Sequence, residues 1–483
     1  MLSFKDTAHV LGALCMILGL SVFLCLPFSL WYEDGQHWPI VYSGLATFLL
    51  GLAGWLLRPR GTARINKRTG YLIVTFGWLA ISAFAMLPYL FSGSIGSVTD
   101  AFFESMSGFT TTGASILNDI EAVAPSILFW RSLTQWIGGM GIIVLSVAIL
   151  PLLGIGGIEL FVAEAPGPTS DKIHPRIQET AKRLWLVYVG LTALLFAGLK
   201  LSGMNLFDAI NHAFTTMATG GFSTKNASVA HWDSPMIQYL IVIFMFLAGT
   251  NFTIIYYFTT GRFRRAWKST EFRAYSLGML IASLIAAILL FLYSNTASEK
   301  LFRDALFQVV SVVSTTGFVT ADYTTWGYLL AFFFFLLMFT GGSAGSTAGG
   351  IKTIRHLVFM KNSFLEFKRI LHPRAMIRIK LDGQVVAPRI LTHILVFLLV
   401  YLGSFVTGTL VMTALGMDLV SSAGAVATCL GNVGPGLGVV GPVSNFADVP
   451  DPGKWALSIL MLLGRLELFT VLVLFTPFYW RAN

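Results

Sequence analysis

The sequence predicts an all-α polytopic membrane protein, with two N-terminal spans followed by four units that each read span, short helix, loop, span. Three observations support this fold class: the composition, the spacing of the apolar runs, and a motif that occurs four times. Of 483 residues, 55% are hydrophobic and only 11% are charged, and the mean hydropathy is +0.75. Soluble globular proteins carry about a quarter charged residues, so the composition indicates an integral membrane protein.

Apolar runs near the length of about 20 residues that a spanning helix needs divide the chain into ten predicted spans. They lie at 10–31, 40–57, 71–91, 126–150, 184–203, 236–258, 275–293, 327–340, 390–415 and 455–479. The first ten residues lead directly into a run of full spanning length, so we expect no cleavable signal peptide.

The distribution of basic residues predicts the orientation. Four loops, at 58–70, 152–183, 259–273 and 352–389, hold 23 of the 32 Lys and Arg residues. The positive-inside rule places these loops, and with them the N-terminus, in the cytoplasm. The net charge of +9 is then explained by this topology and by contact with an anionic inner leaflet, and it gives no reason to expect nucleic-acid binding.

Four segments on the predicted outer side share one layout, which is an internal repeat. In three of them an Asp-Ala pair begins thirteen residues before a glycine, and in the fourth a serine takes the place of the aspartate. The segments are DAFFESMSGFTTTGAS (100–115), DAINHAFTTMATGGFST (208–224), DALFQVVSVVSTTGFVT (304–320) and SSAGAVATCLGNVGPG (421–436). We therefore divide the chain into a two-span domain with a basic loop (1–70) and four repeats (71–157, 158–270, 271–388 and 389–483).

The chemistry of one repeat predicts a pore. Asp100, Asp208, Asp304 and Ser421 are suited to cap a helix N-terminus, and the eight or nine helical residues that follow are too few to span. The negative carbonyl end of such a helix would point to membrane depth. Irregular backbone beyond it is tolerated only when it is buried or lines a water-filled path. Four such loops around one axis form the carbonyl ring that replaces the hydration shell of a monovalent cation. Close packing of small residues between helices is the alternative, but it does not explain four equally spaced copies.

The motifs resemble the Trk/Ktr/HKT superfamily of potassium transporters, and most closely its bacterial TrkH branch, over essentially the full length. The resemblance rests on TTTGA, ATGGFST, STTGFVT and LGNVGPG, on TGGSAGSTAGGIK (340–352), on LGRLELFT (463–470), and on the two extra N-terminal spans. It implies K⁺ uptake across the bacterial inner membrane around a central ion pore, with Rb⁺ and weakly Na⁺ as further cations. It also implies a homodimer with two separate pores and control by a cytosolic nucleotide-binding ring of the TrkA type. K⁺ in the pore would be the bound ion, and a nucleotide would act only through the regulatory partner.

The resemblance also assigns the filter. The family's filter glycines correspond to Gly113, Gly221, Gly317 and Gly434, and a glycine rather than a serine at the first of these positions implies preference for K⁺ over Na⁺. The fourth stretch departs from the threonine-rich pattern, so we expect modest selectivity. The predicted filter residues are Thr111, Thr112, Gly113, Thr219, Gly220, Gly221, Thr315, Thr316, Gly317, Asn432, Val433 and Gly434.

A gate is predicted below the filter. The run 340–350 contains no side chain larger than threonine, and its poor helix propensity indicates an intramembrane loop; close helix contact is the alternative. Arg465 lies within the last span, where a cation costs about +2.5 to +3.5 kcal/mol. It should therefore face the pore or contact another repeat, and Glu467, two residues on, does not share its helix face. The predicted gate residues are Gly341, Gly342, Gly345, Gly349, Gly350 and Arg465. Arg131 and Gln135 are interpreted as packing or filter support.

Two further features concern partners. The alternation Ile377, Ile379, Leu381 followed by Asp382-Gly383 predicts a β-hairpin, which could dock a soluble regulator or contact lipid. Acidic residues in the outer loops, among them Asp119, would concentrate cations at the mouth of the pore.

The main alternative function is a Na⁺- or H⁺-coupled K⁺ symporter. Carriers of that kind usually contain inverted repeats, whereas these four share one orientation. Glu104 and Glu467 are the only membrane-embedded carboxylates in the sequence that could serve the coupling. An enzyme is not predicted, because the eight histidines show no metal-ligand spacing and no Gly-rich phosphate loop follows a strand.

Overall fold

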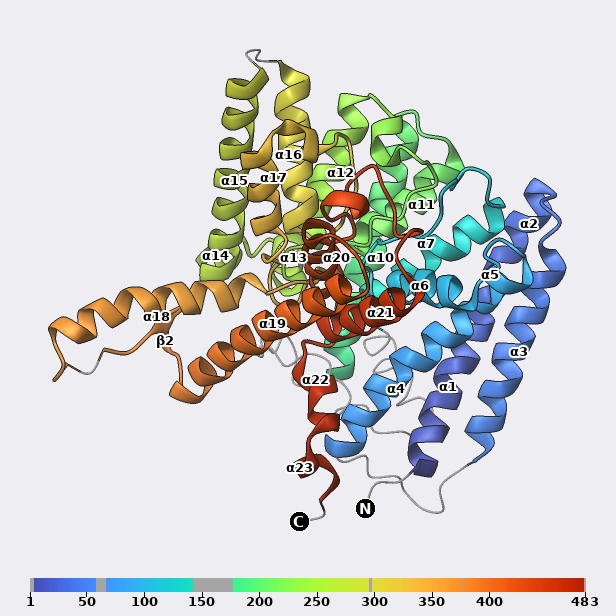
Figure 1. The fold of residues 1–483 in the computed structure, drawn as a ribbon, viewed down its shortest axis with the longest axis horizontal. Helices are drawn as coiled ribbons and strands as arrows, with labels where there is room; N and C mark the ends of the chain where they lie inside the picture. The colour runs from blue at the N-terminus through green and yellow to red at the C-terminus, as the bar shows by residue number, and fades with distance from the viewer. Residues whose placement is uncertain (1–3, 58–66, 142–176, 295–297, 376, 482–483) are drawn as a thin grey trace.

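The computed structural model describes residues 4–57, 67–141, 177–294, 298–375 and 377–481, and it is almost entirely helical (Figure 1). The N-terminal helices α1 (Phe4–Val22) and α3 (His37–Leu56) form an antiparallel hairpin, joined by η1 (Phe23–Cys25) and α2 (Leu26–Tyr32). Glycines permit the close crossing: a Cβ added to Gly12 would lie 2.5 Å from the carbonyl oxygen of Gly51. Small residues at such crossings are typical of packing between membrane helices.

The four predicted repeats follow in order around the molecule. The first contains α4 (Lys67–Ala85), α5 (Leu87–Phe91), α6 (Val98–Phe109) and α7 (Pro125–Gly139), and the second contains α10 (Ile177–Leu201), α11 (Leu206–Met217), η2 (Ser228–His231), α12 (Pro235–Ala248), α13 (Phe252–Thr259) and α14 (Phe263–Lys268). The third contains α15 (Thr270–Ser294), α16 (Glu299–Val313), η3 (Tyr323–Trp326), α17 (Tyr328–Leu337), α18 (Thr353–Leu371), β1 (Lys380–Leu381) and β2 (Gln384–Val385). The fourth contains α19 (Pro388–Ala414), α20 (Leu419–Gly431), η4 (Gly438–Val440), α21 (Asp451–Arg465), α22 (Phe469–Leu472), η5 (Val473–Phe475) and α23 (Pro477–Trp480).

Among the described residues, six helices are long and apolar enough to span a membrane, or eight if each of two bent pairs counts as one span. The sequence predicts ten. The predicted span 126–150 extends beyond the described residues, because α7 is followed only as far as residue 141. The predicted span 327–340 is the ten-residue α17, which ends where the glycine-rich run begins. The predicted boundary between the first two repeats, at 157, lies outside the described residues.

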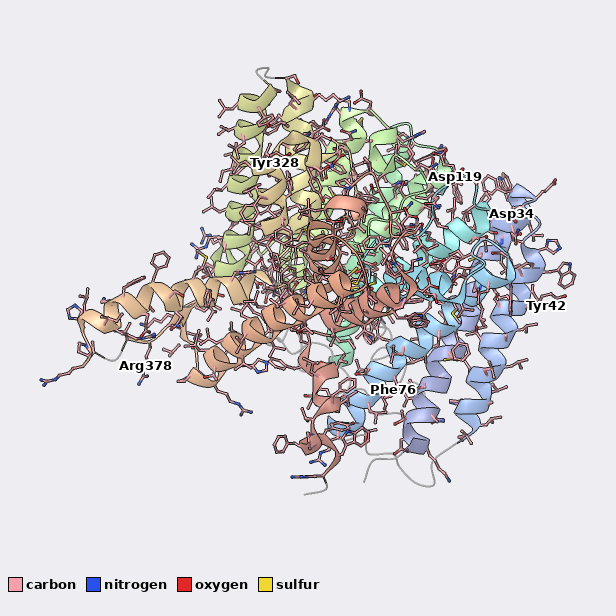
Figure 2. The ribbon with its side chains drawn as sticks, in the orientation of Figure 1. Asp34, Tyr42, Phe76, Asp119, Tyr328 and Arg378 are labelled. Carbon is pink, nitrogen blue, oxygen red and sulfur yellow. The ribbon has the colours of Figure 1, made fainter. Side chains whose placement is uncertain are left out.

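Apolar side chains face outward around the helices, as expected for contact with lipid. Tyr42, Phe76 and Tyr328 are 58%, 48% and 95% exposed and point away from the helices that carry them (Figure 2). Inside, one hydrophobic cluster joins the N-terminal helices to repeats 1 and 4, and a second joins repeats 2 and 3. The interior is therefore continuous around the centre of the molecule, and the four short helices lie within it.

The predicted β-hairpin is confirmed. Lys380 pairs with Val385 across an antiparallel turn, and the two turn residues, Asp382 and Gly383, both have positive φ, as the tight two-residue hairpin turn requires. The Asp382 carboxylate accepts hydrogen bonds from the backbone N–H and the hydroxyl of Thr270, at 2.7 and 2.5 Å. The hairpin is thereby anchored to the start of α15. It connects α18 and α19, which extend to one side of the molecule (Figure 1).

The predicted helix caps are wrong by one or two turns. Ser97, Asn205 and Asp418 cap α6, α11 and α20, each accepting from the N–H three residues on, and Ser298 caps α16 in the same way. The four helices therefore contain 12, 12, 15 and 13 residues instead of eight or nine. The residues predicted as caps lie in or beyond the first turn, where a carboxylate is also favourable. Their side chains bind elsewhere: Asp100 accepts from Lys454 Nζ at 2.5 Å, and Asp208 from the Thr224 hydroxyl at 2.5 Å.

Candidate functional site

The four short helices end with the same backbone turn. The residue after each helix, or one position further, has a left-handed conformation: φ is +52° at Thr111, +55° at Thr219, +55° at Thr315 and +52° at Asn432. In every case its N–H donates to the carbonyl three residues back, and the next N–H donates to the carbonyl five residues back. This is the Schellman termination, which normally uses glycine. Threonine in this conformation costs about 1–3 kcal/mol, so tertiary contacts must hold each of these turns in place.

Two residues further along, the four predicted filter glycines close a ring. Gly113, Gly221, Gly317 and Gly434 all have positive φ, from +74° to +104°. A Cβ added to any of them would lie closer than 3.0 Å to a carbonyl oxygen of the neighbouring quarter. The sequence of contacts is cyclic: Gly113 faces Gly220, Gly221 faces Thr316, Gly317 faces Val433, and Gly434 faces Thr112. The structure thus brings all four predicted filter triplets together around one axis, each glycine leaving room for the next carbonyl.

The packing of the helices follows the same cyclic order. α6 packs against α7 and against α21 of the fourth repeat, α11 against α12 and α7, and α16 against α17 and α12. α20 packs against α21. In three quarters, the short helix therefore lies between the second long element of its own repeat and that of the preceding repeat.

Hydrogen bonds on the lower edge of the ring connect it to the predicted gate. The hydroxyl of Thr111 accepts from Arg465 Nη1 at 3.0 Å, and the hydroxyl of Thr315 accepts from the N–H of Gly349 at 2.7 Å. Asn432 Nδ2 donates to the hydroxyl of Thr112 at 3.0 Å. Three of the four quarters are thus fixed from below or from the side by polar contacts with distant parts of the chain.

The predicted intramembrane loop is confirmed as a segment without regular structure, from Thr340 to Lys352. It packs into the bend between α12 and α13, whose axes differ by 110°. The N–H of Ser343 donates to the carbonyl of Gly249 at 2.8 Å, and the N–H of Phe252 donates to the carbonyl of Gly345 at 3.0 Å. A Cβ added to Gly349 would lie 2.6 Å from the carbonyl oxygen of Gly431, so only glycine lets the loop approach the fourth quarter this closely.

Arg465 lies beneath the ring and contacts two other repeats. Its guanidinium donates to the carbonyls of Gly138 and Gly139 at 2.6 and 2.9 Å, and to the carbonyl of Thr347 at 2.8 Å. Immediately after it, the last span bends by 109°. Of the two sequence interpretations, contact with other repeats is therefore observed, at a position directly below the filter turns.

A cavity of about 190 Å³ lies next to these groups. Its lining comes from the end of α7, from α10, α13, the loop and the bend of the last span, and includes Gly345, Gly349, Gly350, Arg465 and Glu467. Gly341 and Gly342 are buried within the loop. The predicted gate residues thus lie in one region, between the ring and the end of the molecule that carries both termini.

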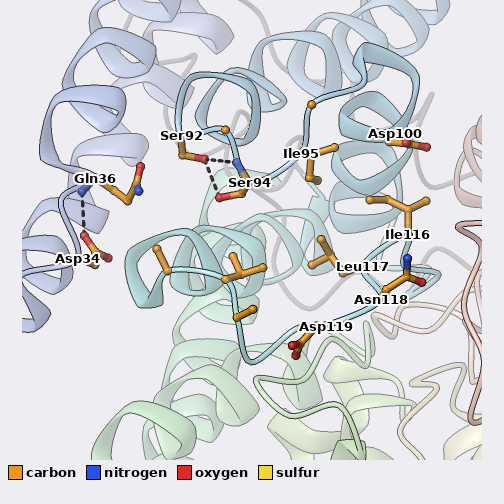
Figure 3. Close-up of a pocket in the computed structure, with 15 residues that line it drawn as sticks. Asp34, Gln36, Ser92, Ser94, Ile95, Asp100, Ile116, Leu117, Asn118 and Asp119 are labelled. Atoms are coloured by element: carbon orange, nitrogen blue, oxygen red, sulfur yellow. Dashed lines mark hydrogen bonds between the residues drawn. The ribbon is translucent and has the colours of Figure 1, made fainter.

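At the opposite end of the molecule, an open pocket of about 770 Å³ contains three aspartates (Figure 3). Asp34 lies on one side, and Asp100 and Asp119 lie across from it. Burial alone would raise the pKa of Asp34, but hydrogen bonds from Ser126, Ser29 and the N–H of Gln36 outweigh it and lower the pKa. The hydrogen bond from Asn226 likewise lowers the pKa of Asp119. These two carboxylates are therefore held in their charged forms near the entrance to the ring.

Sequence reasoning missed a set of braces behind the ring. The residue nine positions before the filter glycine is polar in three quarters, and its side chain binds the chain just beyond that glycine. Glu104 accepts from Ser115 Oγ at 3.0 Å, His212 Nε2 is 2.9 Å from Ser223 Oγ, and Gln308 Nε2 donates to Thr320 Oγ1 at 3.4 Å. The fourth quarter has Ala425 at this position. The equal spacing of nine was present in the sequence as a signal.

The fold and the site define a polytopic helical membrane protein of the pore-loop class, with four helix–loop turns converging on one axis. The model of the TrkH family, described as cation transport protein, matches residues 37–482. The chain belongs to this family, which confirms the resemblance read from its motifs. It is 41% identical to the Trk system potassium uptake protein TrkH of Vibrio parahaemolyticus, over 100% of both chains, and 40% identical to TrkH of Escherichia coli strain K12, over 99% of both. The crystal structure of the potassium transporter TrkH from Vibrio parahaemolyticus matches with a TM-score of 0.89 at 39% identity, covering 99% of this chain and 100% of that one.

Proposed function

We propose that the chain takes up K⁺ by a channel-like mechanism, through the ring formed by its four filter triplets. The observation that supports this most strongly is the cyclic order in which each filter glycine faces the carbonyl of the next quarter. A ring of backbone carbonyls can replace the hydration shell of K⁺. Its relatives of similar length are named as potassium uptake proteins.

The loop 340–352 and Arg465 form the proposed gate. The loop donates a hydrogen bond to the filter threonine Thr315, and Arg465 donates to both Thr111 and the loop carbonyl of Thr347. A fixed positive charge and a loop below the filter would both oppose cation passage. Opening then requires these contacts to break, which displaces the loop and the guanidinium together.

The remaining parts of the proposal follow from the resemblance and from the charge distribution. The protein lies in the bacterial inner membrane with its N-terminus in the cytoplasm, forms a homodimer, and is regulated by a TrkA-type nucleotide-binding ring. The basic segment around α18 and the β-hairpin is the proposed contact for that ring. The ions bound in the pore are K⁺ and, more weakly, Rb⁺ and Na⁺, and a nucleotide acts only through the partner.

The contacts of the two embedded carboxylates argue against a Na⁺- or H⁺-coupled symporter. Glu104 forms an ion pair with Arg131 at 2.5 Å, and Glu467 forms one with Arg355. A carboxylate that carries a coupling proton or sodium ion must be able to exchange partners, and each of these is held by an arginine. We therefore favour passive, electrically driven uptake.

Flux into proteoliposomes tests the proposal. Purified protein, reconstituted under an inward K⁺ gradient, should admit K⁺ and Rb⁺ faster than Na⁺. The rate should follow the membrane voltage and should not change when the pH or Na⁺ gradient is varied at fixed voltage. K⁺ accumulation against its electrochemical gradient would refute the channel-like mechanism, and equal rates for all three cations would refute the filter.

A further inference from the structure

The second quarter of the ring differs from the other three in its middle residue. Thr112, Thr316 and Val433 occupy that position in the first, third and fourth quarters, and Gly220 occupies it in the second. Gly220 is followed by the filter glycine Gly221. Two consecutive glycines give the backbone more conformational freedom than any other pair, so this quarter has the least intrinsic resistance to rotation of its carbonyl.

A buried glutamine of the neighbouring repeat compensates for that freedom. Gln135 of α7 is fully buried; its Nε2 donates to the carbonyl of Gly220 at 2.7 Å, and its Oε1 accepts from the N–H of Phe222 at 3.1 Å. The two bonds flank the filter glycine Gly221. Because Phe222 N–H can only donate, the orientation of the amide is determined by the contacts themselves.

The glycine and the glutamine are sterically reciprocal. A Cβ added to Gly220 would lie closer than 3.0 Å to the amide atoms of Gln135, so a threonine like those of the first and third quarters does not fit here while Gln135 is present. In the part of the chain that the structure describes, no protein hydrogen bond reaches the carbonyls of Thr112, Thr316 or Val433. The amide of Gln135 thus replaces, from outside, the restraint that a side chain supplies elsewhere.

One turn earlier on the same face of α7, Arg131 extends this restraint. It is 2% exposed, pairs with Glu104 at 2.5 Å, donates to the carbonyl of Ser223 at 3.0 Å, and lies over the ring of Phe222 at 3.5 Å from its centroid. Glu104 in turn accepts from the N–H of Ile116 at 2.9 Å. The two α7 side chains therefore hold the second quarter from Gly220 to Ser223, and Arg131 also links it to the first quarter through a buried ion pair.

We propose that Gln135, supported by Arg131, is a positioning residue that sets cation selectivity by fixing the carbonyl of Gly220 at the ring. The proposal rests on the proposed function of the ring. With the amide in place, the Gly220 carbonyl keeps its distance from the axis and cannot close around a smaller cation. Without it, the Gly220-Gly221 segment can rotate, and discrimination between K⁺ and Na⁺ falls.

The test compares Gln135→Met with a matched control, Gln238→Met. Both glutamines are buried, and each donates to a backbone carbonyl, but Gln238 binds that of Trp232 at 2.9 Å, away from the ring. In proteoliposomes, Gln135→Met should lower the ratio of K⁺ to Na⁺ influx roughly fivefold, the equivalent of one neutral hydrogen bond. Gln238→Met should leave the ratio unchanged. An unchanged ratio in a conducting Gln135→Met protein would overturn the proposal.

A rescue experiment separates positioning from general stability. The double variant Gln135→Ala with Gly220→Thr removes the amide and restores a β-branched middle residue like those of two other quarters. It should regain much of the selectivity that Gln135→Ala alone loses, and no recovery in a conducting double variant would count against the proposal. If the Gln135 variants do not fold, Arg131→Lys decides by the same ratio, because lysine keeps the charge opposite Glu104 but lacks the planar fork that also reaches Ser223. A wild-type protein that passes K⁺ and Na⁺ equally would refute the proposed function itself, whatever the variants do.

Discussion

Replacing Gly113 by serine tests the ring most directly. Its φ is +82°, where any side chain costs about 1–3 kcal/mol, and the new Cβ would lie closer than 3.0 Å to the carbonyl oxygen of Gly220. That oxygen is part of the backbone and is already bound by Gln135, so it can yield only by leaving its place in the ring. If the displaced carbonyl loses as little as about 1.4 kcal/mol of preference for K⁺, the selectivity falls tenfold.

The assay is the ratio of initial K⁺ and Na⁺ influx into proteoliposomes, measured at equal protein density. Gly416→Ser is a matched control, because Gly416 has a similar φ of +96° but an added Cβ would meet nothing within 4 Å. The control carries the same kind of backbone strain without the contact. A Gly113→Ser protein that keeps wild-type uptake and excludes Na⁺ would refute the assignment of this stretch as a filter quarter.

Three further perturbations address the gate and the outer loops. Deleting 343–349 should raise K⁺ flux because it removes the loop below the filter, and an unchanged rate would argue against gating. Arg465→Ala should raise single-protein flux roughly tenfold for each 1.4 kcal/mol of barrier removed; a rate no faster than wild type would assign Arg465 a structural role only. Asp34→Asn should lower stability at neutral pH by roughly 1 kcal/mol after allowance for solvent screening. Because the folded pKa of Asp34 is lowered, this difference should vanish as pH falls through that pKa, and thermal melts in detergent between neutral and acidic pH would show a constant gap if the reasoning is wrong.

The parts of the site that are local in sequence could be predicted. The thirteen-residue spacing located all four glycines that close the ring, and the absence of bulky side chains located the loop 340–352. The turn chemistry of Asp382-Gly383 located the hairpin. Each of these depends on the conformational preferences of a few adjacent residues, which are encoded where they act.

The caps of the short helices illustrate where local reasoning fails. Asp100 and Asp208 are good caps by residue type, and the chain places equally good ones, Ser97 and Asn205, three positions earlier. Only tertiary packing decides between the two, since it determines where the chain turns extended. The aspartates then bind Lys454 and Thr224, partners that no spacing rule connects to them. The contacts of Gln135 and Arg465 are of the same kind, because they cross between repeats.

The fourth quarter shows how the ring tolerates a divergent sequence. Asn432 replaces a threonine there, yet its φ and its pattern of backbone hydrogen bonds match those of the other quarters. Asparagine enters the left-handed region more readily than threonine, so this quarter is locally the least strained of the four. The asymmetry of the ring lies instead in its side-chain contacts: Asn432 binds the hydroxyl of Thr112, and Gln135 binds the carbonyl of Gly220. We therefore expect any departure from fourfold selectivity to respond more to Gln135 than to the unusual residues of the fourth stretch, because only Gln135 acts on a carbonyl of the ring itself.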